Sequence, residues 1–281
     1  MDERGRDNDI EARVDASGPA DANSFFSCGP NIHGVIGLFS LTTDDGAVMG
    51  NSIAGPDGKF FDTAGMTTSP MVVDMEICGP ALALGSQAAS FAELDSDAFT
   101  DARSVDFWFQ PGTVQAEAYA IEGLLTKDTL LGMDGDFGLY IVRNTDNEYQ
   151  LVAQRQVGSE LNVNCSAPGI TRAEWHHVAV SFTDTGVDTV FLDGAKLAGT
   201  ILSPDAPVVG DIACASSQLV GVRPTENSQP WHWGSGPSIT DSEKNTNFSG
   251  LIDELRFRDA EMSEGQALNF YETGISGLSN R

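Results

Sequence analysis

The stretch TRAEWHHVAVSFTDTGVDTVFLDGAKLAGT, residues 171–200, decides the fold class of this chain. Between Trp175 and Phe182 the residues alternate between two faces, and the valines share one face with the phenylalanine. This period-two alternation, closed by Asp184-Thr185-Gly186, predicts a strand followed by a turn. A second strand is expected at 188–192, because the Asp-Gly pair that follows supplies the positive φ of a tight hairpin. The stretch therefore predicts an antiparallel β-meander and an all-β protein.

Short runs of the same kind recur along the chain, separated by turn residues. They lie at residues 32–41, 71–77, 81–84, 90–94, 105–109, 118–126, 137–143, 149–154 and 196–201. A spacing of about 8 to 12 residues between strands favours a β-sandwich or jelly roll. One helix is expected at 263–271, where Ser263 can cap the first turn and where Leu268 and Tyr271 face inward.

Three pairs of segments resemble a known family. They are GPALALGSQAASFAEL with VDFWFQP (79–94 and 105–111), WHHVAV with VFLDG (175–180 and 190–194), and FSGLIDELRF with AEMSE (248–257 and 260–264). In this order they resemble the early strands, the central hairpin, and the closing strand and short helix of the laminin-G-like, concanavalin A-like lectin/glucanase superfamily. The resemblance implies an all-β, concanavalin A-like antiparallel β-sandwich, a jelly roll, with one short C-terminal helix. We expect this domain at residues 31–281, after an N-terminal arm or linker at residues 1–30.

The composition is that of an acidic globular protein. Among 281 residues, 41 are acidic and 15 are Lys or Arg, so the formal net charge is -26 at pH 7. Such a charge repels nucleic acids and anionic membranes, and neither is an expected partner. No run of about 18 apolar residues is present, so no membrane insertion is expected.

The N-terminal sequence MDERGRDNDIEARVD lacks the apolar core of a signal peptide. Either a signal was removed and Met1 was added, or the protein is made without a signal. Laminin-G-like domains work mostly outside cells, and a virus particle reaches the outside without a secretion signal. The resemblance therefore implies an extracellular, cell-surface or virion-surface protein, with self-assembly through the N-terminal arm as one option.

A calcium site is expected from the resemblance. The family has a loop of the form D-x-S-G-N-G-N-x-G that is often linked to a structural calcium, and Asp44 and Asn51 match it in kind within the loop at 42–58. The spacing differs from the family pattern by about one residue. Asp253, in the I-D-E motif, corresponds to a further frequent ligand. Carboxylate and carbonyl oxygens suit Ca²⁺, whereas the alternative is that Asp44 and Asp45 only form an Asx-turn.

A long polar segment at residues 223–247 carries the densest aromatic patch of the chain, Trp231-His232-Trp233. Long loops in compact domains are often functional, and exposed indole rings can stack on the apolar face of a sugar. These three residues are therefore candidate ligand-binding residues. The alternative is that a tryptophan covers an edge of the core and that no site exists there.

The four cysteines are even in number and far apart in the sequence, which allows three disulfide pairings. The plausible bridges are Cys165–Cys214 and Cys28–Cys78. Buried free thiols remain an alternative.

No catalytic residue is expected. The nearest match to the carboxylate pattern of family 16 glucanases, Glu93-Leu94-Asp95-Ser96-Asp97, lacks the second glutamate. His176 and His177 are adjacent strand residues that point to opposite faces and cannot ligate one metal together. We expect one of them to be packed and the other solvated.

These observations favour a non-catalytic recognition or adhesion module that works outside the cell, is stabilised by calcium, and binds a glycan or a protein through its edge loops. The alternative is a structural subunit of an extracellular assembly, such as a virion surface protein or a filament. A glycoside hydrolase or polysaccharide lyase is the third option, which the incomplete carboxylate pattern disfavours.

Overall fold

The structure is a computed structural model of the whole chain. It describes residues 35–39, 48–49, 58–62, 66–68, 71–74, 80–85, 91–95, 97–113, 121–127, 136–143, 149–157, 160–166, 169–183, 187–197, 219–220, 229–234 and 247–279. The expected N-terminal arm, residues 1–30, lies outside them. No helix within the described part of the chain is long and apolar enough to cross a membrane.

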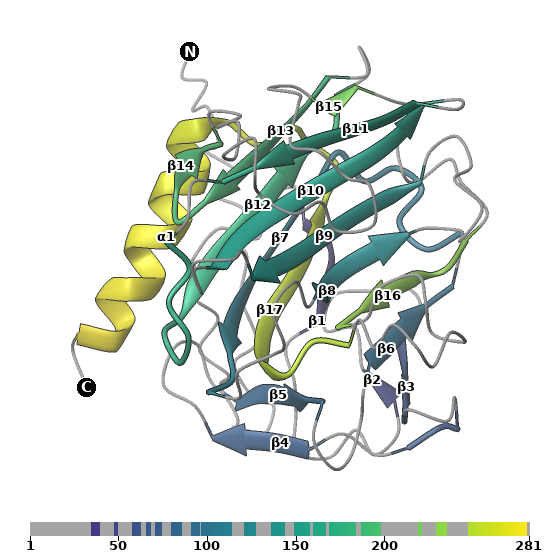
Figure 1. Cartoon of the computed structure of the whole chain (residues 1–281), viewed down its shortest axis with the longest axis vertical. Helices are drawn as coiled ribbons and strands as arrows, with labels where there is room; N and C mark the ends of the chain where they lie inside the picture. The colour runs from purple at the N-terminus through teal and green to yellow at the C-terminus, as the bar shows by residue number, and fades with distance from the viewer. Residues whose placement is uncertain are drawn as a thin grey trace, which may run out of the picture.

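The described strands form two antiparallel sheets, which Figure 1 shows as overlapping layers with the single helix along one side. Sheet A has the order β14 (Ala195–Lys196), β13 (Val187–Leu192), β12 (His176–Ser181), β7 (Ser104–Pro111), β17 (Gly250–Arg258), β5 (Pro80–Leu84) and β4 (Met71–Asp74). In addition, β1 (Val35–Phe39) pairs with β17, and β15 (Leu219–Val220) pairs with β13.

Sheet B has the order β11 (Glu160–Cys165), β10 (Tyr149–Val157), β9 (Phe137–Arg143), β8 (Ile121–Lys127), β16 (Trp231–Trp233), β6 (Phe91–Leu94), β3 (Gly58–Phe61) and β2 (Val48–Met49). The predicted antiparallel sandwich is thus confirmed. The hairpin predicted within residues 171–200 is formed by β12 and β13. Asp193 and Gly194, in the turn between β13 and β14, have φ angles of 51° and 78°.

The main core lies between the two sheets and is built by alternate residues of their strands. On β7, Val105, Phe107 and Phe109 point into this core. On β12, Val178 and Val180 do the same, whereas Ala179 between them points to the other face of sheet A. The period-two pattern in the sequence is therefore the pattern of core contact.

Helix α1 (Glu264–Ser279) packs on the outer face of sheet A, and begins with the predicted cap. Ser263 and Gln266 form a reciprocal capping box, in which Ser263 N donates to Gln266 Oε1 at 2.9 Å and Gln266 N donates to Ser263 Oγ at 3.3 Å. Tyr271 stacks on Trp108 of β7 with ring centroids 6.0 Å apart, as expected for an inward-facing residue.

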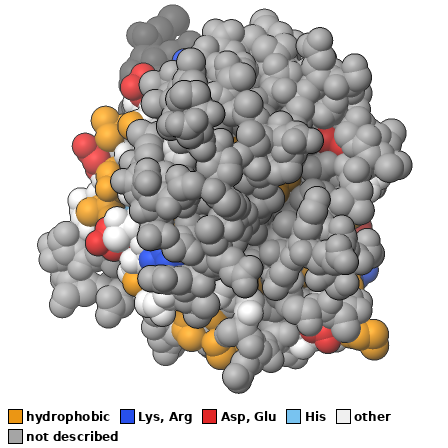
Figure 2. Space-filling model, viewed as in Figure 1, with side chains coloured by type: hydrophobic (Ala, Val, Ile, Leu, Met, Phe, Trp, Pro, Cys, Tyr) orange, Lys and Arg blue, Asp and Glu red, His pale blue; other side chains and the backbone are white. Residues whose placement is uncertain are grey.

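The prediction for Leu268 is wrong, because its side chain is 43% exposed. The helix turns Ala267 and Phe270 toward the sheet instead, one residue before and two residues after Leu268. Figure 2 shows hydrophobic and acidic side chains together along the side of the molecule where Figure 1 shows α1. Leu268 and Glu272 are exposed residues of this helix.

Candidate binding site

The Trp231-His232-Trp233 motif forms strand β16, which is hydrogen-bonded between β6 and β8 in the middle of sheet B. Both tryptophan side chains are completely buried, and both belong to the main core. Trp231 packs edge-on against Phe137 and Phe257, at centroid distances of 6.3 and 5.4 Å.

The expectation that these indole rings stack on a ligand is therefore wrong. A ring enclosed between two sheets has no face left for a sugar, and the alternative that the tryptophans belong to the core holds. The polar character of the surrounding segment suggested a loop, but Trp231 and Trp233 alternate around His232, which is a strand pattern. His232 alone points to the opposite face of sheet B.

His232 belongs to a row of residues across the outer face of sheet B. The strand register places Lys59 of β3, Glu93 of β6, His232 of β16 and Thr126 of β8 side by side. Their neighbours in sequence, such as Phe60 and Trp233, point into the core. Lys59, Glu93 and His232 therefore share the face of the sheet that is turned away from the core.

Two aromatic rings lie beside this row. Phe61 of β3 stacks on Phe91 of β6, with ring centroids 5.2 Å apart and planes 12° apart. Phe91 in turn meets the edge of the His232 ring at 5.6 Å and 86°. We call the group Lys59, Phe61, Phe91, Glu93 and His232 the Glu93 face.

The Glu93 face is open to solvent on one side. Lys59 is exposed, Phe61 is partly exposed, and the Glu93 side chain is 32% exposed. His232 and Phe91 are buried behind them. The face thus offers an aromatic ring, a carboxylate and an ammonium group on one surface, which is the mixture that recognises polar ligands with an apolar side.

Glu93 is held in its ionised form. The Nε2 atom of His232 lies 3.2 Å from Glu93 Oε2. This hydrogen bond is the main reason why the pKa of Glu93 lies below its usual value, and the charge of Lys59 acts in the same direction. An ionised carboxylate accepts hydrogen bonds and cannot serve as a proton donor.

Asp253, the one expected calcium ligand within the described residues, lies on β17 with Trp108 as its register partner on β7. Its carboxylate is buried, and its Oδ2 atom has no hydrogen-bond partner in the described structure. Burial, followed by the charge of Glu254, raises the pKa of Asp253 well above its usual value. Such an oxygen fits a cation ligand, because a cation would supply the missing partner.

The other two expected calcium ligands, Asp44 and Asn51, lie outside the described residues. Within the described ranges no three His, Cys, Asp or Glu side chains come together as a metal-binding group. Asp253 is thus the part of the expected site that the structure places.

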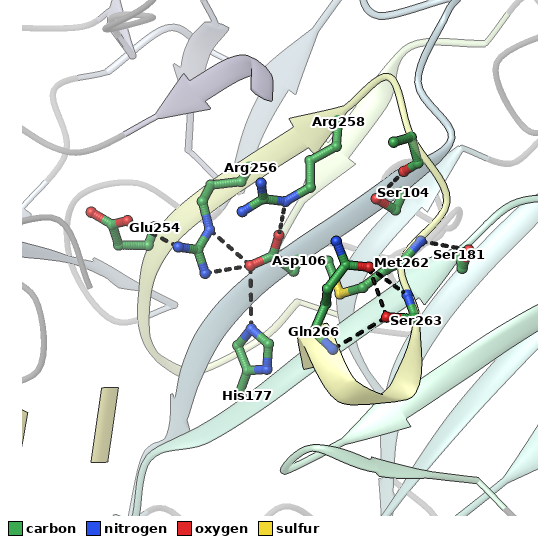
Figure 3. A network of polar contacts seen from close by, with 11 residues as sticks. Ser104, Asp106, His177, Ser181, Glu254, Arg256, Arg258, Met262, Ser263 and Gln266 are labelled. Carbon is green, nitrogen blue, oxygen red and sulfur yellow. Dashed lines mark hydrogen bonds and ion pairs between the residues drawn. The ribbon is translucent and has the colours of Figure 1, made fainter. Parts of the chain in front are cut away.

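A β-bulge follows Asp253 in β17. Glu254 has a φ of 55°, and two residues of β17 stand opposite one residue of β7 at this point. Directly after the bulge, Arg256 and Arg258 both bind Asp106 of β7, with Arg256 Nε 2.8 Å from Oδ2 and Arg258 Nε 3.1 Å from Oδ1 (Figure 3). The network anchors the strand that carries the I-D-E motif.

His177 completes this network from β12, with Nε2 3.2 Å from Asp106 Oδ2. Burial alone would raise the pKa of Asp106, but Arg256, His177 and Arg258 together hold it well below its usual value. Phe270 of α1 covers both arginines, with its ring centroid 5.0 Å from the guanidinium of Arg256.

The two adjacent histidines point to opposite faces of sheet A, as predicted, but the expectation that one is solvated is wrong. His177 is fully buried, and His176 is 5% exposed. His176 Nδ1 lies 2.8 Å from Asp193 Oδ2 in the hairpin turn. Burial lowers the pKa of His176, but the contact with Asp193 outweighs it and the net shift is upward. Both histidines therefore have structural partners.

Cys165 forms a disulfide. The other three cysteines of the expected pairs, Cys28, Cys78 and Cys214, lie outside the described residues, so the proposed pairings stay predictions. The alternative of a free thiol at Cys165 is wrong.

Lys59, Phe61 and Phe91 were not predicted from the sequence as site residues, and Glu93 was considered only as a catalyst. The alternation Lys59-Phe60-Phe61 is the one local signal, because it marks a strand with Lys59 and Phe61 on a common face. Their approach to His232, more than 130 residues away along the chain, follows from the insertion of β16 beside β6.

Comparisons with known proteins agree with this architecture. A family model described as the concanavalin A-like lectin/glucanases superfamily, Laminin_G_3, matches residues 84–214. Among solved structures, the chain is similar to domain 4 of AbnA, a GH43 extracellular arabinanase from Geobacillus stearothermophilus, in complex with arabinotriose. The identity is 17% and the TM-score 0.52, over 84% of this chain and 98% of that one.

The chain is also similar to a mutant of Trypanosoma rangeli sialidase displaying trans-sialidase activity. The identity is 12% and the TM-score 0.51, over 88% of this chain and 34% of that one. The chain thus spans about a third of that protein.

No curated protein matches the sequence. At such low identities the two structural likenesses show the fold alone, but the family model covers most of the first pair of resembling segments and the whole central hairpin, while the closing pair at 248–264 lies beyond its end. Residues 84–214 therefore match the laminin-G-like domains of the concanavalin A-like lectin/glucanase superfamily.

Proposed function

We propose that this protein is a non-catalytic recognition module that binds a glycan outside the cell. The observation that carries the proposal is the Glu93 face, where the partly exposed ring of Phe61 lies beside the ionised, one-third exposed carboxylate of Glu93. Sugars have an apolar ring face and a rim of hydroxyl groups, so they fit an aromatic ring flanked by polar groups.

The state of the carboxylates favours binding over catalysis. Glycoside hydrolysis requires a carboxylic acid with a raised pKa that can reach the scissile oxygen. Glu93 has the opposite shift. The described carboxylates with raised pKa values are Glu122, Asp188 and Asp253, and all three are at most 5% exposed.

Two of these acids also have arginine partners inside the fold. Arg172 donates to Glu122, and Arg155 Nε lies 3.1 Å from Asp188 Oδ2. Their raised pKa values are a consequence of burial, and their carboxyl groups are not accessible to a substrate.

A broad glycan array tests the proposal, with product analysis of every bound oligosaccharide. The arabinanase domain that shares this fold is in complex with arabinotriose, so arabinose-containing oligosaccharides belong among the first probes. We expect binding to a related set of sugars and no cleavage products. Cleavage that is lost in Glu93→Gln would contradict the non-catalytic assignment, and a blank array would contradict glycan binding.

We also propose that a calcium ion stabilises the domain at Asp253. The support is the buried Oδ2 atom without a partner, next to Glu254 at the bulge. Because a ligand that binds only the folded state stabilises it by RT ln(1 + [L]/Kd), Ca²⁺ at a hundredfold excess over Kd adds about 2.7 kcal/mol.

The melting temperature with calcium chloride and with chelator tests this second proposal. We expect calcium to raise it in the wild type and in the control Asp259→Asn, whose side chain is exposed, but not in Asp253→Asn. Equal calcium responses in all three proteins would rule out Asp253 as a ligand.

A further inference from the structure

We propose that the Glu93 face binds an uncharged sugar residue, with Phe61 as the stacking surface, Glu93 as a hydrogen-bond acceptor and Lys59 as a donor. The inference rests on the proposed glycan-binding function. It adds the place of binding, the residues that bind, and the charge of the ligand.

The polar groups of the face lie in line across three neighbouring strands. Lys59 pairs with Glu93 in the register of β3 and β6, and Glu93 pairs with His232 in the register of β6 and β16. Adjacent strands are about 4.8 Å apart. The three side chains therefore span about 10 Å, which is the width of one to two sugar rings and their hydroxyl groups.

The aromatic surface is prepared for stacking. Phe61 is held flat against Phe91, and Phe91 is fixed by the edge contact with His232. A ring whose orientation is already set loses little conformational entropy when a ligand stacks on it. In the turn after β3, Met66 O accepts a hydrogen bond from Asp62 N at 2.9 Å, and the Met66 side chain is 66% exposed.

Hydrogen-bond accounting shows which groups the ligand must bring. The carboxylate of Glu93 can only accept, so the His232 Nε2 atom that faces it carries a proton. In the neutral ring, Nδ1 is then an acceptor, and it is buried without a hydrogen-bond partner in the described structure. The His232 side chain is 9% exposed. Because this nitrogen is buried, the acceptor that the face offers to a ligand is the partly exposed carboxylate of Glu93.

The charge balance selects an uncharged ligand. The charges of Lys59 and Glu93 cancel each other, and the face offers the carboxylate of Glu93 as an acceptor and the ammonium group of Lys59 as a donor. Hydroxyl groups can donate to Glu93 and accept from Lys59, whereas the carboxylate of an acidic sugar would meet Glu93 as a like charge. The overall charge of -26 repels an anionic ligand further.

Direct binding measurements with purified full chain and its variants test the inference. The probes are uncharged pentose and hexose oligosaccharides and, for comparison, sialylated and uronic-acid oligosaccharides. Phe61→Leu keeps an apolar side chain against Phe91 but removes the flat ring, and Glu93→Gln keeps the shape but removes the charge. Lys196→Ala and Glu272→Gln are matched controls at exposed positions on β14 and α1.

We expect the wild type to bind uncharged oligosaccharides with a Kd that changes little with salt concentration. Phe61→Leu and Glu93→Gln should each weaken binding about tenfold or more, and the controls should not. Loss of binding in the controls, or unchanged binding in both site variants, would overturn the site while leaving the glycan-binding function intact. Binding restricted to acidic sugars would overturn the charge class, and no binding to any probe would overturn both proposals.

His232 is a positioning residue in this account, because it acts through Glu93. His232→Phe keeps an aromatic ring against Phe91 and removes both nitrogens. Without the hydrogen bond from His232, the pKa of Glu93 rises toward its usual value, so the acid limb of the binding–pH profile should move to higher pH. A profile of unchanged shape in this variant would show that His232 has no part in the site.

Discussion

Arg256 on β17 donates from Nε to Oδ2 of Asp106 on β7 across 2.8 Å, and both side chains are buried. The two residues are register partners directly after the bulge at Glu254. A buried ion pair that sits beside a change of register holds that register, because sliding β17 by one residue would leave both charges without partners. The closing strand is thus locked to the centre of sheet A.

Removal of this carboxylate should be costly. Asp106→Asn removes the carboxylate that two buried arginines share, and we expect the free energy of unfolding at pH 7 to fall by about 3–5 kcal/mol. Denaturant unfolding followed by tryptophan fluorescence measures the loss. A change of less than about 1 kcal/mol would show that the network does not hold the fold.

The same variant should change the response to acid. The pKa of Asp106 in the folded protein lies below its usual value of 3.8, so its stabilising contribution is present above about pH 4 and is lost as the pH falls toward the folded-state pKa. The wild type should therefore lose stability between about pH 5 and pH 2 more steeply than Asp106→Asn. If the stability of the two proteins changed equally with pH, the lowered pKa of Asp106 would be contradicted.

Asp188 should produce the opposite pH dependence. Burial, despite the ion pair with Arg155, raises its pKa from 3.8 to about 6. The folded state then binds the proton more tightly than the unfolded state, so stability falls as the pH rises from about 4 to above 6. At about 1.4 kcal/mol per pH unit this amounts to about 3 kcal/mol. Asp188→Asn should flatten that part of the stability curve, and an unchanged slope would exclude Asp188 as its source.

Two glycines of α1 offer a matched pair of alanine substitutions. A Cβ atom at Gly274 would come within 2.2 Å of the Trp108 ring, whereas a Cβ atom at Gly265 meets nothing within 4 Å. We expect Gly274→Ala to lower stability by about 1–3 kcal/mol through overpacking, and Gly265→Ala to be neutral or stabilising by up to about 1 kcal/mol. Thermal unfolding compares the two, and equal effects would contradict the packing of α1 on Trp108.

The buried position of β16 makes a clear prediction for its tryptophans. Trp233→Ala should cost about 3–5 kcal/mol, because it removes a completely buried side chain from the main core. Met66→Ala, at a side chain that is 66% exposed, should stay within about 0.5 kcal/mol of the wild type. A folded Trp233→Ala protein with wild-type stability and lost ligand binding would restore the indole ring as a binding surface.

Local sequence pattern predicts the parts of the fold that local geometry decides. Strands β12 and β13 are recognised from alternation and from the Asp193-Gly194 turn, and α1 from its cap at Ser263. The start of the helix is right, but its end is eight residues too early, because Gly274 breaks the pattern and yet serves the packing against Trp108.

The candidate site is a product of long-range strand order, which the local pattern does not contain. Trp231 and Trp233 lie in a polar segment that is typical of a loop, and only the placement of β16 between β6 and β8 buries them. The same placement brings His232 within hydrogen-bond distance of Glu93. Glu93, which the sequence marks only as part of an incomplete catalytic pattern, thereby becomes the centre of a candidate binding face.

Titration of an uncharged oligosaccharide into ¹⁵N-labelled protein tests the central claim most directly. The account predicts that the largest amide shift changes map to β3, β6 and β16, with Lys59, Phe61, Glu93 and His232 among the affected residues, and that Glu93→Gln abolishes them at the same sugar concentration. Shift changes confined to other elements, or none with any uncharged sugar, would contradict the assignment of this face as a glycan-binding site.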